Sequence, residues 1–234
     1  MNLPENDNKS SGLILNISKP IGWTSFDVVR RIKREVNAAK VGHAGTLDPF
    51  ANGVLLVCIG KATKRIAELM SFEKEYVATL QLGVETDSID ISGKVTKIAK
   101  VPSLDLQKII ESVKSFEGEI EQVPPKFSAV KIDGRRSYQL ARAGDEITNK
   151  TRQVRIHEIE ILDYYDSIIK FRVVCSKGTY IRSLARDISL KLDTVGYLRK
   201  LTRIRIGEYK IQSSLQVNEL KSFKTEFNGN HIRH

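Results

Sequence analysis

Apolar residues recur along this chain with two different spacings, which predict a mixture of strands and helices. Runs that are continuously apolar, or that alternate with polar residues, favour strands, and they occupy residues 13–17, 54–59, 76–82 and 169–175. Apolar residues three or four positions apart favour amphipathic helices, and they occupy residues 26–36, 61–70, 106–116 and 181–192. Thr24, with Asp27 three residues later, is typical of a capping box. The elements follow no strict strand–helix–strand rhythm, so the pattern predicts an α+β fold with a mixed sheet.

The regular pattern is lost at both ends and in one internal stretch. Residues 1–12 are polar and are expected to be a disordered tail, and residues 221–234 are expected to be a second short polar tail. Residues 123–152 contain two adjacent prolines, two glycines and many basic residues, which predicts a long excursion from the core. Residues 13–220 are expected to form the main domain, with this excursion inserted in it.

The charge balance favours a polyanionic partner. The chain has 38 Lys and Arg against 28 Asp and Glu, a net charge of +10, and nucleic acid is the first candidate for such a surface. A protein that is merely basic is the alternative. Clustering favours the functional interpretation, and the clusters are Lys61, Lys64 and Arg65; Lys126, Lys131, Arg135, Arg136 and Arg142; and Arg199, Lys200, Arg203 and Arg205.

Several classes of protein are disfavoured by the composition. No apolar run approaches the roughly 18 residues of a membrane span, and the first residues do not resemble a signal peptide. Cys58 and Cys175 both lie in strand-like runs and are expected to be buried thiols of a protein in the reducing cytoplasm. There is no Cys-x-x-Cys pair and no Gly-rich phosphate loop, so neither a zinc site nor a nucleotide cofactor is expected.

The stretch from Val41 to Gly53 is the leading candidate for chemistry. It contains three glycines, His43 and the carboxylate of Asp48, and an apolar run follows it directly. A polar loop supported by a buried strand is a common place for catalytic groups. Ordinary turn chemistry explains the same residues equally well, because Asp-Pro opens turns and Asn-Gly forms hairpins.

Two further places carry candidate groups. Tyr76 begins a predicted strand, and Tyr180 and Arg182 lie in a strand-to-helix turn that could present backbone N–H groups to an anion. Each residue also has an ordinary structural interpretation, as an aromatic at an element end or as a solvated arginine.

Taken together, these stretches carry a resemblance to a known family. In order along the chain, the matching blocks are Gly42 to Pro49, Gly60 to Lys64, Lys74 to Tyr76, Gly83 to Asp87, Val123 to Lys131, Ser176 to Arg182 and Leu198 to Leu201. In these blocks the chain resembles the TruB family of tRNA pseudouridine synthases, over roughly residues 13–220. The resemblance implies the pseudouridine synthase fold, a mixed and mostly antiparallel sheet flanked by helices with a central RNA-binding cleft.

The resemblance also implies an activity and its residues. The family isomerises uridine 55 in the T loop of tRNA to pseudouridine, after the base is flipped out. Asp48 is then the nucleophile, attacking either C1′ of the sugar or C6 of the base, and Arg182 pairs with it. The implied roles of the other residues are stacking on the base for Tyr76, lining of its pocket for Tyr180 and Leu201, support of the remodelled loop for His43, and contact with the RNA backbone for Lys64 and residues 123–152.

The chain departs from many bacterial members after Leu220, where a small C-terminal RNA-binding domain is usual. Recognition through the T arm of tRNA is therefore expected. The protein is also expected to be a cytoplasmic monomer that needs no metal, cofactor, membrane or obligate protein partner. Two other classes stay open. One is a non-catalytic RNA-binding protein or RNA chaperone, against which Asp48, Tyr76 and Arg182 together argue. The other is a hydrolase using Asp48, for which neither a second carboxylate nor a metal site is evident.

Overall fold

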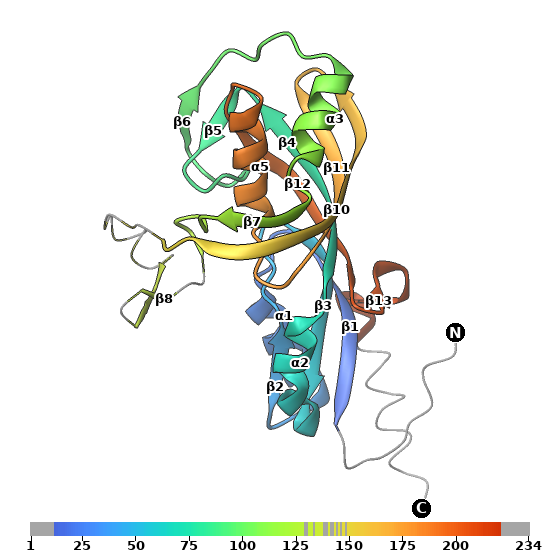
Figure 1. Ribbon diagram of the computed structural model, residues 1–234. Helices are drawn as coiled ribbons and strands as arrows, with labels where there is room; N and C mark the ends of the chain where they lie inside the picture. The colour runs from blue at the N-terminus through green and yellow to red at the C-terminus, as the bar shows by residue number, and fades with distance from the viewer. Residues whose placement is uncertain are drawn as a thin grey trace, which may run out of the picture. The chain divides into compact units, whose positions relative to one another are not determined.

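The computed structural model describes residues 12–220, except residues 129, 130, 133, 138, 139, 141, 142, 144, 146 and 148 (Figure 1). Of the expected tails, residues 1–11 of the tail at 1–12 and all of the tail at 221–234 lie outside the described residues. The chain forms two compact units, one up to Phe72 and again from Arg203, the other from Glu73 to Thr202. The domain boundaries expected from the sequence stay a prediction.

The first unit is built on a strand that is apolar on both faces. Strand β3 (Asn52–Ile59) pairs antiparallel with β1 (Leu13–Lys19) and with β2 (Val41–Ala44). The short β14 (Leu215–Gln216) lies parallel to β1, and the end of β12 (Gly196–Ile206) pairs with β13 (Tyr209–Lys210). The helical segments of this unit are η1 (Gly60–Arg65), α1 (Ser25–Val36), α2 (Ile66–Ser71), η2 (Ile211–Ser213) and η3 (Val217–Glu219).

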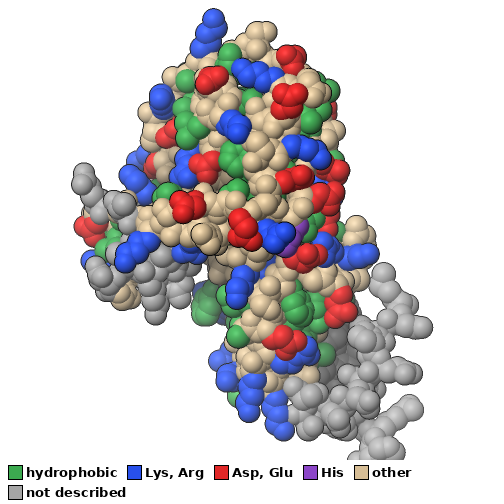
Figure 2. Space-filling model, viewed as in Figure 1, with side chains coloured by type: hydrophobic (Ala, Val, Ile, Leu, Met, Phe, Trp, Pro, Cys, Tyr) green, Lys and Arg blue, Asp and Glu red, His purple; other side chains and the backbone are tan. Residues whose placement is uncertain are grey.

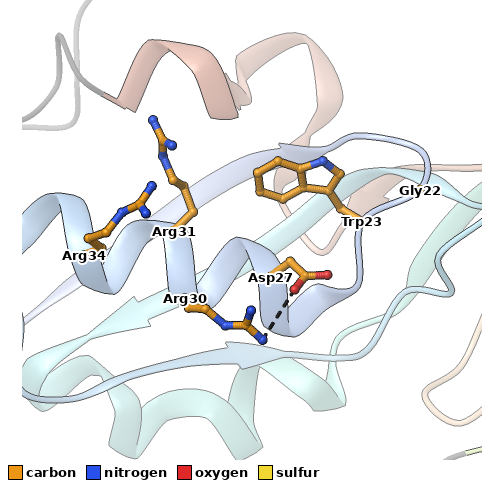
Figure 3. A pocket seen from close by; sticks show the side chains of 6 residues that line it. All are labelled: Gly22, Trp23, Asp27, Arg30, Arg31 and Arg34. Atoms are coloured by element: carbon orange, nitrogen blue, oxygen red, sulfur yellow. Dashed lines mark ion pairs between the residues drawn. The ribbon is translucent and has the colours of Figure 1, made fainter.

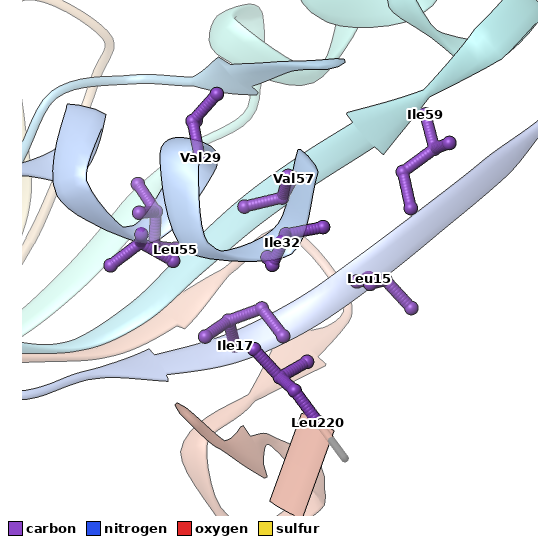
Figure 4. Packing of buried hydrophobic residues seen from close by; sticks show 9 residues of the cluster. Leu15, Ile17, Val29, Ile32, Leu55, Val57, Ile59 and Leu220 are labelled. Atoms are coloured by element: carbon purple, nitrogen blue, oxygen red, sulfur yellow. The ribbon is translucent and has the colours of Figure 1, made fainter. Parts of the chain in front are cut away.

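Two apolar clusters explain the continuous apolar run of β3. Leu55 and Val57 pack with β1 and with Val28 and Ile32 of α1 (Figure 4). The alternate residues of β3, such as Leu56, join a second cluster. Because successive strand residues point to opposite faces, a strand between two cores must be apolar throughout.

Helix α1 confirms the expected start but not every expected core residue. Thr24 accepts a hydrogen bond from the Asp27 backbone N–H, and the Asp27 carboxylate accepts one from the Thr24 N–H. Val29 and Ile32 are buried as expected. Phe26 is not, since 61% of its surface is exposed, and it lies instead under the guanidinium of Arg30, 5.2 Å from the ring centre.

In its described residues, the second unit is an antiparallel sheet with two longer helices. Its strands lie in the order β12, β4, β11, β10, β7. The pairings of β4 with β11, of β11 with β10 and of β10 with β7 are all antiparallel. The bounds are β4 (Lys74–Leu82), β7 (Gly118–Gln122), β10 (Arg152–Tyr165), β11 (Ile168–Cys175) and β12 (Gly196–Ile206). The remaining elements are α3 (Leu106–Lys114), α5 (Ile181–Lys191), and the strand pairs β5 (Val84–Thr86) with β6 (Val95–Ile98) and β8 (Lys131–Ile132) with β9 (Arg135–Arg136). The α+β class and the mostly antiparallel pairing are confirmed.

In the described part of the basic excursion, residues 123–152, the two ends are hydrogen-bonded to each other. The side chain of Asn149 is buried and donates to the carbonyl oxygens of Pro124 and Pro125, at 3.1 and 2.9 Å. Arg135, in contrast, is exposed on β9 and lies 3.7 Å from Asp145. Arg142 and the side chain of Arg136 are outside the described residues.

Other expectations concern the thiols and the membrane. Cys58 and Cys175 are both buried free thiols, and burial raises the pKa of Cys58 to about 11. Within the described residues, no helix is long and apolar enough to cross a membrane.

Candidate functional site

Asp48 lies half-buried in the loop between β2 and β3, between two apolar anchors. Leu47 and Phe50 are buried on either side of it, and the Ala51 N–H donates to the Asp48 carbonyl oxygen at 3.1 Å. Asn52 and Gly53 do not form the hairpin turn that their sequence allows, because they are the first two residues of β3. The apolar neighbours fix the loop, while Asp48 itself stays partly exposed.

The start of α1 and the end of β1 hold the Asp48 loop from one side. The buried Ser25 hydroxyl accepts from the Leu47 N–H at 2.9 Å and donates to the Leu47 carbonyl oxygen at 3.2 Å. The Gly22 N–H donates to the carbonyl oxygen of Pro49 at 2.8 Å. Both residues that flank Asp48 are thus held by groups that precede α1 or begin it.

Lys19, the last residue of β1, is a fully buried cation that links the segment before α1 to the Asp48 loop. Its ammonium group donates to the carbonyl oxygens of Trp23 at 2.7 Å, Pro20 at 2.9 Å and Pro49 at 3.5 Å. Burial lowers the pKa of Lys19 to about 8, and the charge of Arg203 acts in the same direction. The charge of Asp48 opposes that shift, so the two groups stabilise each other's ionised forms.

Arg203 holds the loop from the opposite side. Its guanidinium is buried and donates to the carbonyl oxygens of Val54 at 2.7 Å, Gly45 at 3.1 Å and Thr46 at 3.3 Å. A Cβ atom at Gly53 would lie 2.2 Å from the Arg203 carbonyl oxygen, and Gly53 has φ of +109°. Glycine is therefore required there for β3 to approach Arg203. The sequence analysis placed Arg203 in a basic cluster expected to face a polyanion. The structure shows that this expectation is wrong for Arg203, because its guanidinium is buried and hydrogen-bonded inside the unit.

The other two candidates of the first unit lie on different elements. His43 is partly buried in β2, where it pairs with Val57 of β3. Lys64 is exposed on η1. The segment at residues 61–70, expected to be one amphipathic helix, is divided between η1 and α2, and its last apolar residue, Met70, is 45% exposed.

Tyr76, Tyr180 and Leu201 belong to the second unit. Tyr76 is 8% exposed in β4, paired with Val173 of β11, and Leu201 of β12 is also buried. Tyr180 precedes α5, and its backbone N–H donates to the Gln122 side-chain oxygen at 2.7 Å. The guanidinium of Arg152 lies 5.5 Å from the centre of the Tyr180 ring. The N–H that could have met an anion at this turn is therefore already used within the unit.

Arg182 is buried in α5 and belongs to a network that the sequence did not reveal. Its guanidinium lies 3.4 Å from the carboxylate of Asp90 and donates to the carbonyl oxygens of Ser88 and Phe127, both at 2.9 Å. Asp90 is itself fixed, because it accepts from the Ser88 hydroxyl and from the Ser92 N–H, each at 2.9 Å. Asp48 and Arg182 lie in different units, and their expected pairing stays a prediction.

Asp90 is the functional candidate missed by reasoning from the sequence. It follows the block from Gly83 to Asp87, but it sits in a turn where aspartate is common for local reasons. Only the ion pair with Arg182, 92 residues further along the chain, marks Asp90 as a functional candidate. Among the described residues there is no group of three or more His, Cys, Asp and Glu side chains suited to a metal ion.

Comparison with known proteins decides the family. Residues 33–181 match the model of the TruB family pseudouridylate synthase N-terminal domain. The chain belongs to the TruB family. Membership confirms that the protein is an enzyme of the isomerase class.

The relatives and solved structures agree with this assignment. The chain is 48% identical to the tRNA pseudouridine synthase B of Bacteroides fragilis over 216 residues, 89% of this chain and 92% of the relative. It is also 48% identical to the enzyme of that name from Clostridium acetobutylicum, over 88% of this chain and 71% of the relative. A crystal structure of a Cbf5-Nop10-Gar1 complex matches with a TM-score of 0.74 and 33% identity.

That structural match covers 95% of this chain, and the chain spans 57% of the matched protein. A structure of an H/ACA RNP bound to a substrate RNA is similar, with a TM-score of 0.70 and 31% identity. The expected pseudouridine synthase fold is confirmed by these structures.

Proposed function

We propose that this protein isomerises uridine 55 in the T loop of tRNA to pseudouridine, with Asp48 as the nucleophile. The names of the relatives from Bacteroides fragilis and Clostridium acetobutylicum support tRNA as substrate. The observation that carries the role of Asp48 is its loop. Leu47 donates to the buried Ser25 hydroxyl and Pro49 accepts from the Gly22 N–H, while Asp48 between them stays partly exposed. Such prior fixing is what nucleophilic attack at a defined atom needs.

The reaction exchanges one bond for another within the same nucleotide. The C1′–N1 glycosidic bond breaks, the uracil turns over, and a C1′–C5 bond forms as C5 loses its proton and N1 gains one. The carboxylate of Asp48 adds to C1′ or to C6 and is released at the end, so the enzyme is regenerated. Lys19, buried beside the loop and coupled electrostatically to Asp48, favours the ionised carboxylate that must attack.

The residues of the second unit are proposed to handle the flipped base. Tyr76 stacks on the uracil, and Tyr180 and Leu201 line the pocket. Arg182, held by Asp90, is proposed to pair with Asp48. His43 supports the remodelled T loop, and Lys64 together with residues 123–152 contacts the RNA backbone.

The decisive experiment replaces the nucleophile without changing its size. Asp48→Asn should bind a tRNA transcript with nearly unchanged affinity and form no pseudouridine, because an amide cannot form the covalent intermediate. Asp193→Asn, an exposed aspartate in the other unit, is the matched control and should react like the wild type. Mapping of pseudouridine at each uridine of the product measures both site and extent. Appreciable pseudouridine from Asp48→Asn would refute the assignment.

The same assay separates the other functions. A non-catalytic RNA-binding protein would bind the transcript and modify nothing. A hydrolase would release uracil or cleave the RNA chain, and either product would be seen by mass spectrometry. Using the purified chain alone also tests the proposal that no protein partner is needed, and the cytoplasmic monomer expected from the sequence stays a prediction.

A further inference from the structure

A groove runs along the exposed flank of α1, in the first unit. It encloses about 430 Å³ and is lined by Gly22, Trp23, Asp27, Arg30, Arg31 and Arg34 (Figure 3). Four of these positions, 27, 30, 31 and 34, are spaced three or four residues apart and therefore share one face of the helix. We refer to this surface as the α1 groove.

Cations predominate in the α1 groove. Its lining contains three arginines and one carboxylate. Hydrogen bonds from Thr24 hold the pKa of the Asp27 carboxyl below its usual range, so Asp27 is ionised and pairs with Arg30 at 3.6 Å. Arg31 contacts Glu35 through Nε at 3.0 Å. Arg34 has no ion-pair partner among the described residues.

Trp23 gives the groove an aromatic wall. One side of its indole packs against the apolar cluster of β1, β3 and α1. Trp23 and Arg31 also line a second groove, on the other side of which lie residues of β14 and η3. Aromatic rings beside arginines are typical of surfaces that bind single-stranded nucleic acid, where bases stack and guanidinium groups meet phosphates.

The α1 groove is directly connected to the Asp48 loop. The Gly22 N–H donates to the Pro49 carbonyl oxygen, and the Lys19 ammonium bonds the carbonyl oxygens of both Trp23 and Pro49. The rim of the groove and the residue after Asp48 are therefore fixed to each other. A polymer that places one nucleotide at Asp48 has neighbouring nucleotides within reach of this rim.

We propose that the α1 groove binds the phosphodiester backbone of the RNA substrate next to the target nucleotide, with Trp23 against a base or ribose. This inference rests on the proposed function. Arg30 and Arg34 are one helical turn apart, about 6 Å along the axis, which is of the order of the spacing between successive phosphates. The charge complementarity and the position beside Asp48 favour RNA over an acidic protein.

The test removes the three charges and measures binding of a T-arm stem-loop. Replacing Arg30, Arg31 and Arg34 by Gln should weaken the affinity ten- to a hundredfold. It should also reduce the slope of log K against log salt by about 2, since roughly 0.7–0.9 counterions are released per phosphate contact. The matched control replaces Lys97, Lys108 and Lys114, exposed lysines of the second unit, and should keep both values. The single substitution Arg34→Gln removes an exposed charge without an ion-pair partner, and should weaken binding measurably without affecting folding.

Trp23 supplies a direct readout because it is the chain's one tryptophan. Adding the stem-loop should change its emission in the wild type and in the control, and at the same RNA concentration much less in the triple variant. Uridine monophosphate and inorganic phosphate serve as competitors. If either at millimolar concentration reproduces the change and displaces the RNA, the groove is a small-anion site and the proposal is overturned.

The failures of the two proposals are distinguishable. If the wild type forms pseudouridine while the triple variant binds RNA as the control does, the proposed RNA-binding role of the α1 groove is refuted and the proposed function stands. If the wild type forms none, but RNA affinity and salt slope fall in the triple variant, the function is refuted and the groove is retained as an RNA-binding surface. At saturating protein the triple variant should react within about threefold of the wild type, because the groove contributes binding rather than chemistry.

Discussion

At the scale of single residues, the environment of Asp48 is made by groups whose roles the sequence does not mark. Lys19 and Arg203 read as ordinary basic residues, yet both are buried and donate to carbonyl oxygens around the Asp48 loop. A buried cation is costly unless its donors are satisfied, so these two are tied to the loop geometry. Asp48 itself could be selected from the sequence because the surrounding glycines and apolar run are local signals.

Lys19 makes the stability of the protein depend on pH in a specific direction. Its pKa is about 8 in the folded protein against 10.5 in an exposed lysine, so the unfolded chain binds more protons between these values. The wild type should therefore gain stability relative to Lys19→Met as the pH rises from 7 to 9.5, by about 1–2 kcal/mol. Urea unfolding of both proteins at several pH values measures the difference. A stability difference that is constant over this pH range would show that the pKa of Lys19 is not lowered in the folded protein.

At the scale of elements, local sequence patterns predicted the start of a helix, but contacts between elements could not be predicted from the sequence. Thr24 and Asp27 predicted the start of α1, and the structure has the reciprocal hydrogen bonds of a capping box. Phe26 has helical spacing but is exposed, because spacing alone does not define which edge of an apolar stripe meets the core. The pairing of Arg182 with Asp90 could not be predicted, since it depends on the packing of α5 against a turn 92 residues earlier.

The capping box gives a quantitative expectation for α1. Thr24→Ala removes the acceptor of the Asp27 N–H and should lower the free energy of unfolding by about 1 kcal/mol. Thr96→Ala, at an exposed position of β6, is the control and should change stability by less than half as much. Because α1 presents both Ser25 and the α1 groove, Thr24→Ala should also reduce affinity for RNA. Equal unfolding midpoints for the two variants would show that the box does not stabilise the helix.

At the scale of the whole molecule, the family could be identified from blocks of residues in the right order, but the division into two compact units could not. The units meet in sequence at Phe72–Glu73 and at Thr202–Arg203. Neither place has the glycines or prolines that mark a linker, and the second lies within the uninterrupted strand β12. The net charge of +10 indicated a polyanionic partner without indicating which arginines face it, and Arg203 shows that some do not.

The two cysteines allow the opening rate of each compact unit to be measured separately. Cys58 is buried in the first unit and Cys175 in the second, and both are free thiols. A thiol reagent can modify such groups only when the surrounding structure opens. Mass spectrometry of the labelled peptides therefore gives a separate opening rate for each unit in a single native sample. Equal rates at all denaturant concentrations would mean that the units open as one, whereas a faster rate at one cysteine would identify the unit that opens first.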